Sequence, residues 1–106
     1  MSNILYIDTS DNKKITIGLG IDGKKTSQSE DTSLLRSEAA LPLIDRICKH
    51  CNINIIDLDK INVNVGPGSF TGLRVGIAIA NALSFLLKIP INGKKIGELE
   101  EPVYNK

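Results

Sequence analysis

The stretch VGPGSFTGLRVGIAIANAL, residues 65–83, joins a strand-like segment to a long apolar one through a turn rich in glycine and proline. Just before it, in residues 61–65, isoleucine and valine alternate with asparagine, which is the period of a half-buried strand. After the turn, a helix is predicted from near Thr71 to near Lys88, because Pro90 disfavours helical geometry at the residue before it. The stretch therefore predicts a strand, a sharp turn and a helix in succession.

The turn itself has two possible roles. Backbone N–H groups at a helix start can hold an anion, but a P-loop requires a lysine where Leu73 stands, and the dinucleotide fingerprint requires a glycine where Thr71 stands. Alternatively the glycines and the proline only shape a tight turn that Ser69 or Thr71 caps. The residues that would lie near a nucleotide are Asp8, Gly66, Pro67, Gly68, Ser69, Phe70, Thr71 and Arg74.

Small residues recur every four positions along the predicted helix, at Gly72, Gly76, Ala80 and Ser84. A glycine inside a helix costs about 1 kcal/mol relative to alanine, so two of them indicate a need for close packing. Either a helix of a partner protein or the first helix of the same chain fills this groove. The candidate partner interface comprises Gly72, Val75, Gly76, Ile79, Ala80, Leu83, Ser84, Leu41 and Ile44. On this view a leucine at position 76 blocks association and leaves the domain folded.

The remainder of the chain predicts an α/β domain. Residues 4–7 form an apolar run typical of a strand covered on both faces, and alternating residues 15–21 lead through the Asp22-Gly23 turn into a polar strand at 24–29. Helical spacing follows between Leu41 and Cys51, where Pro42 should kink the helix or confine it to later residues. With a short strand at 89–91, we expect a mixed five-stranded sheet, two main helices and one domain over residues 1–106.

Composition narrows the function. The net charge of +1, the 4% aromatic content and the lack of tryptophan argue against a protein that reads RNA bases alone. No secretory signal is evident, and the longest apolar stretch is too short to cross a bilayer. We therefore expect a cytoplasmic protein that does not bind membranes.

Two further features suggest chemistry only weakly. Cys48 and Cys51 enclose His50 in a C-x-x-C pattern, but no second pair of ligands completes a zinc site, so two packed thiols are the preferred interpretation. Asp8 ends the first strand, where it could position a metal ion or water, or form an Asx turn onto Ser10. No nucleophile, base and orienting residue can be assembled, so we expect neither catalytic nor metal-binding residues.

Three segments resemble the TsaB (YeaZ-type) family, a subunit of the bacterial complex that makes threonylcarbamoyladenosine in tRNA. They are ILYIDTS at 4–10, RSEAALPLID at 36–45 and VGPGSFTGLRVGIAIANAL at 65–83. The resemblance implies an actin-like, RNase H-like domain of the sugar kinase and heat-shock ATPase superfamily. It also implies a non-catalytic scaffold that pairs with a TsaD-like catalytic subunit or with itself.

The same resemblance implies a TsaE-like ATPase as a further partner, contact with tRNA only through the complex, and ATP and magnesium bound by the partner subunits. On this resemblance we expect the family's usual second domain to be absent, and Arg36 stands where the family commonly has histidine. Two alternatives stay open. One is an actin-like nucleotide hydrolase using Asp8 and the 66–72 loop, and the other is a homodimeric interaction domain without a tRNA role.

Overall fold

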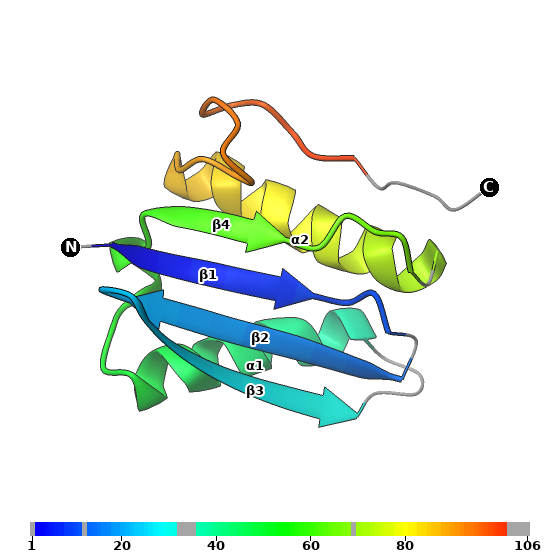
Figure 1. The fold of residues 1–106 in the computed structure, drawn as a ribbon, viewed down its shortest axis with the longest axis horizontal. Coiled ribbons are helices and arrows are strands. Elements are labelled where there is room, and N and C mark those ends of the chain that lie inside the picture. The colour runs from blue at the N-terminus through cyan, green and yellow to red at the C-terminus, as the bar shows by residue number, and fades with distance from the viewer. Residues whose placement is uncertain (1, 12, 32–35, 69, 102–106) are drawn as a thin grey trace.

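The computed structural model describes residues 2–11, 13–31, 36–68 and 70–101 as one sheet with two helices (Figure 1). The strands pair in the order β3-β2-β1-β4, with β4 parallel to β1 and the other pairs antiparallel. The elements are β1 (Asn3–Asp8), β2 (Lys14–Ile21), β3 (Lys24–Asp31), α1 (Arg36–His50), a 3-10 turn (Ile55–Asp57), β4 (Lys60–Val63) and α2 (Phe70–Leu87). The α/β class and the mixed sheet are confirmed.

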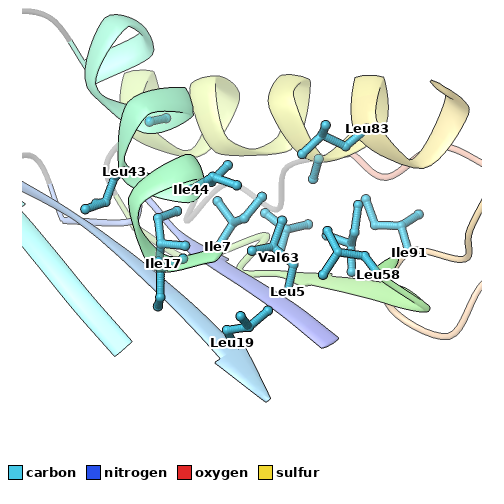
Figure 2. Packing of buried hydrophobic residues seen from close by; sticks show 14 of the residues in the cluster. Leu5, Ile7, Ile17, Leu19, Leu43, Ile44, Leu58, Val63, Leu83 and Ile91 are labelled. Atoms are coloured by element: carbon cyan, nitrogen blue, oxygen red, sulfur yellow. The ribbon is translucent and has the colours of Figure 1, made fainter. Parts of the chain in front are cut away.

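Both helices lie behind the sheet in Figure 1, so the molecule has two layers. Helix α1 packs on β2 and β3, and α2 packs on β4 and β1. Figure 2 shows strand side chains such as Leu5, Ile7 and Val63 pointing toward Ile44 and Leu83 of the helices. Burial of these apolar surfaces is the main stabilising contribution to the fold.

The opposite face of the sheet is open. In β1, Leu5 and Ile7 are buried under the helices, whereas Ile4 and Tyr6 point the other way and are only partly buried. The prediction that this strand is covered on both faces is therefore wrong. Within the described residues, neither helix covers the face that carries Tyr6 (Figure 1).

The sheet has four strands where five were predicted. Residues 89–91 make a single bridge, from Ile91 to Ile61, because Pro90 has no N–H and Asn92 adopts a left-handed backbone with φ 49°. The Asn92 side chain then replaces a strand at the β4 edge. Its oxygen accepts the Val63 N–H at 2.8 Å and its amide donates to the Val63 carbonyl at 3.0 Å.

The predicted bounds of α2 are confirmed, and the helix ends where Lys88 turns into the left-handed region with φ 56°. Helix α1 begins at Arg36 and continues through the exposed Pro42, so the prediction that proline confines it to later residues is wrong. Burial of Leu43, Ile44 and Ile47 offsets the hydrogen bond that proline cannot donate.

Candidate functional site

Residues 8–10, at the end of β1, meet residues 64–68 and 70–76, which follow β4, at one end of the sheet, and we call them the loop–turn cluster. Asn64 joins the two segments. Its amide donates to the Asp8 carboxylate at 3.3 Å and to the Ser10 hydroxyl at 3.2 Å, while its side-chain oxygen accepts the Gly66 N–H at 2.9 Å. One side chain thus fixes the start of the glycine-rich loop against the end of β1.

The glycines of this loop permit close approach to the β1 turn. A methyl group on Gly68 would lie 2.7 Å from Ser10 Cβ and 2.9 Å from the Ser10 carbonyl oxygen. A methyl group on Gly76 would overlap Thr9, whose buried hydroxyl donates to the Gly72 carbonyl. The interpretation of the loop as a tight structural turn therefore has direct support, whereas no observation tests its proximity to a nucleotide.

Asp8 forms the expected Asx turn. Its Oδ1 accepts the Ser10 N–H at 2.9 Å and the Ser10 hydroxyl at 2.6 Å. Partial burial raises the pKa of Asp8, but the hydrogen bonds from Ser10 and Asn64 and the charge of Lys14 together lower it below its ordinary value. The carboxylate is therefore ionised at neutral pH and serves as an acceptor. In the described part of the chain, no three histidine, cysteine or acidic side chains are grouped as metal ligands.

The small-residue stripe faces the interior of the chain, so its assignment to a partner interface is wrong. Ala80 is fully buried, Ser84 is 2% exposed and donates to the Ile89 carbonyl at 2.6 Å, and Gly76 lies against Thr9. Leu83 and Ile44 also belong to the core. The filler of the groove at Gly76 is the turn after β1, not a helix of this chain or of a partner. Spacing reveals such a stripe without revealing which way it points.

The opposite side of α2 is exposed and apolar. We call Val75, Ala78, Ile79, Ala82, Phe85 and Leu86 the outer α2 face. Phe85 and Leu86 are 72% and 71% exposed, and no charged residue occurs between Arg74 and Lys88. Of the predicted interface residues, Val75 and Ile79 lie on this face half-buried, and Leu41 is 53% exposed on α1. The face combines large apolar side chains with two alanines that allow close helix packing.

Sequence reasoning missed several of these residues. Ala78, Ala82, Phe85 and Leu86 could have been found from the unbroken run of uncharged residues, which is more than one buried face requires. No pattern in the sequence marked Thr9 or Asn64 as part of the site. Thr71 and Arg74 are exposed at the start of α2, Ser69 lies outside the described residues, and Phe70 is described only as the first residue of α2.

The C-x-x-C pair fits the packed-thiol interpretation. Cys48 is 3% exposed in the core, Cys51 is half-buried, and both are free thiols. Burial raises the pKa of Cys48, and the neighbouring Asp45 and Cys51 raise it further. Cys48 is therefore a protonated and poorly reactive thiol at neutral pH.

Comparisons with known proteins agree with the geometry. A family model described as "TsaD: tRNA N6-adenosine threonylcarbamoyltransferase" matches residues 24–94. The chain is 33% identical over 116 residues to the tRNA threonylcarbamoyladenosine biosynthesis protein TsaB of Bacillus subtilis, which covers 96% of this chain and 49% of that protein. It is 38% identical over 92 residues to TsaB of Buchnera aphidicola subsp. Schizaphis graminum, covering 85% and 42% of the two chains.

A solved structure shows the same fold. The chain superposes on YeaZ from Pseudomonas aeruginosa with a TM-score of 0.81 and 28% sequence identity, over 90% of this chain and 44% of that one. The likeness supports the expected actin-like α/β arrangement, with four strands in place of five. The chain spans less than half the length of each of these relatives. None of the helices among the described residues has the length and hydropathy to span a membrane.

Proposed function

Because the chain belongs to the family described as tRNA N6-adenosine threonylcarbamoyltransferase (TsaD) and is a TsaB homologue within it, we propose that it is a non-catalytic scaffold subunit for threonylcarbamoyladenosine modification of tRNA. In this role it binds and supports a TsaD-like catalytic subunit. A TsaE-like ATPase completes the assembly. ATP and magnesium belong to those partners, and tRNA is reached through the complex.

The outer α2 face is the observation that carries this proposal. Its two large side chains, Phe85 and Leu86, are more than two-thirds exposed on a rigid helix. Apolar clusters of this kind on a structured element mark protein–protein contacts, and a helix of a partner can approach closely over Ala78 and Ala82. A second copy of the chain is the competing occupant, and it would use the same face.

The loop–turn cluster supports a structural role over a catalytic one. Asp8, the carboxylate that a nucleotide hydrolase would need, already accepts three hydrogen bonds from Ser10 and Asn64. Gly68 and Gly76 allow the turn after β1 to pack against the loop and α2. The glycine-rich motif therefore positions α2, the helix that presents the docking face.

The test is co-purification of the chain with the TsaD-type protein of the same organism. Leu86→Glu places a negative charge on the outer α2 face. Burying this charge in the interface without an opposite charge beside it should lower the affinity for the TsaD-type protein at least about tenfold. Ile56→Glu is the matched control, because Ile56 is also 71% exposed but lies on the 3-10 turn. Retention of the partner by Leu86→Glu at the wild-type level, with the variant folded by circular dichroism, would exclude this face.

A further inference from the structure

The open face of the sheet carries polar side chains in three cross-strand rows. Paired residues share a face, so each row can be taken from the strand register. The first row is Lys60, Ile4, Gly20 and Lys25, the second is Asn62, Tyr6, Gly18 and Ser27, and the third contains Asp8, Thr16 and Ser29. Since β4 buries Ile61 and Val63 under the helices, Lys60 and Asn62 point to the open side.

Beside Tyr6 on this face, β2 has glycines at two positions, Gly18 and Gly20, and therefore no side chains there. A methyl group on Gly20 would be 3.2 Å from Tyr6 Cε2, and one on Gly18 would be 3.2 Å from Tyr6 Cβ. The ring therefore lies over the bare backbone at Gly20, while the Lys25 side chain crosses Gly18, where a methyl group would be 3.0 Å from Lys25 Cε. Above the ring, Lys25 Nζ is 4.1 Å from its centre. A flat aromatic surface with a cation on it is a platform on which a planar group can stack once the flexible lysine moves aside.

A shallow hollow surrounds this ring. Its volume is about 310 Å³, and its lining includes Tyr6, Asp8, Lys25, Ser27, Asn62 and Asn64. Within the described residues, the Asn62 amide and the Ser27 hydroxyl have no hydrogen-bond partner, so both groups remain available to a ligand. An amide presents donors and an acceptor side by side, which suits the edge of a nucleobase.

The charges are separated along the face. Lys25 and Lys60 stand in the first row, and Asp8 stands in the third, beyond Tyr6. No ion pair of either lysine is present in the described part of the chain. A ligand stacked on Tyr6 would thus have the positive charges of Lys25 and Lys60 on one side and the negative charge of Asp8 on the other.

We propose that this face binds an unpaired nucleotide of an RNA strand, with its base on Tyr6, its phosphate at Lys25 and Lys60, and its base edge toward Asn62. Open sheets recognise single strands by this combination of an aromatic platform, basic side chains and free polar groups. The site adds a direct RNA contact to the scaffold role, in which tRNA is reached through the partner subunits, and only the choice of RNA over DNA rests on that role. A protein partner fits less well, because Tyr6 and Ile4 are the only large apolar side chains in the three rows.

The experiment measures binding of a short fluorescein-labelled adenine oligoribonucleotide to the isolated chain by fluorescence anisotropy. Tyr6→Leu should weaken binding at least about fivefold, the lower range for loss of one stacked base, whereas Tyr6→Phe should retain it. Lys25→Gln and Lys60→Gln should each reduce the slope of log affinity against log salt by about 0.7. Lys24→Gln is the matched control, since it removes the same charge one residue away, where the strand alternation points the side chain to the other face.

Two results would overturn the proposal. One is an absence of binding at low salt, and the other is binding that Lys24→Gln weakens as much as Lys25→Gln, which would indicate a diffuse charge effect. Because Tyr6→Leu also removes the packing of the ring on β2, the amide resonances of Gly18 and Gly20 provide a second measurement in the wild-type chain. They should shift on titration with the oligonucleotide, and AMP should compete only weakly. Since no partner protein is present, failure here leaves the scaffold role untouched.

Discussion

Gly76 decides whether α2 can lie against the end of β1. Thr9 is fully buried, and its hydroxyl is held by the Gly72 carbonyl one helical turn before Gly76. The threonine therefore has little freedom to move away from a side chain at position 76. The need for glycine arises from this contact within the chain, which explains why a poor helix former occupies the middle of a stable helix.

We predict that Gly76→Ala destabilises the fold although alanine favours helices. The gain in helix propensity is about 1 kcal/mol, whereas overpacking against Thr9 costs about 1 to 3 kcal/mol, so the net change is a loss of stability of up to about 2 kcal/mol. Urea denaturation should show a lower midpoint. Ala78→Leu is the control, because it adds bulk to the exposed side of the same helix and should leave the midpoint nearly unchanged. A stabilised Gly76→Ala would show that Thr9 moves aside.

At the scale of elements, the four strands and α2 could be predicted from the sequence because each has a strong local signal. Alternation marks β2 and β4, and Pro90 marks the end of α2. The absence of a fifth strand at residues 89–91 could not be predicted, since it depends on the Asn92 side chain, which forms hydrogen bonds to the backbone of Val63. Which way the small-residue stripe of α2 faces could not be predicted either. That direction follows from the position of Thr9, and the sequence does not reveal it because α2 carries apolar side chains on its exposed face as well as its buried one.

The edge of β4 yields a prediction of its own. Asn92→Ala removes both hydrogen bonds to Val63 and the 2.8 Å bond that the Asn92 amide donates to Glu100. Leaving partly buried backbone groups unpaired costs about 1 to 3 kcal/mol, so the free energy of unfolding should fall by this amount. Hydrogen exchange should show faster exchange of the Val63 amide, while that of Leu5 in the middle of the sheet changes only with global stability. Unchanged protection at Val63 would mean that another group covers the edge.

At the scale of the whole molecule, the two-layer design separates two surfaces. The outer α2 face lies on the side of the sheet that the helices cover (Figure 1). Tyr6 faces the opposite side, because its strand neighbours Leu5 and Ile7 are buried under the helices. The shortest dimension of the molecule, 22 Å, runs through both layers. Substitutions at sites this far apart, without shared contacts, have independent effects. The two proposed ligands, a partner on the helices and an RNA strand on the sheet, would therefore not compete for one surface.

We therefore predict that each binding activity can be removed by substitution without loss of the other. Leu86→Glu should lose the TsaD-type partner and bind the oligoribonucleotide as the wild type does, whereas Tyr6→Leu should lose the oligoribonucleotide and retain the partner. Each variant carries its own folding control, because the surface that still binds its ligand must be intact in that variant. Pull-down and anisotropy on the same two preparations measure both activities. If Leu86→Glu weakened both, the two ligands would share one surface or the variant would be unfolded, and circular dichroism separates these cases. If each variant affected only its own ligand, the chain would be a bridge between protein and RNA.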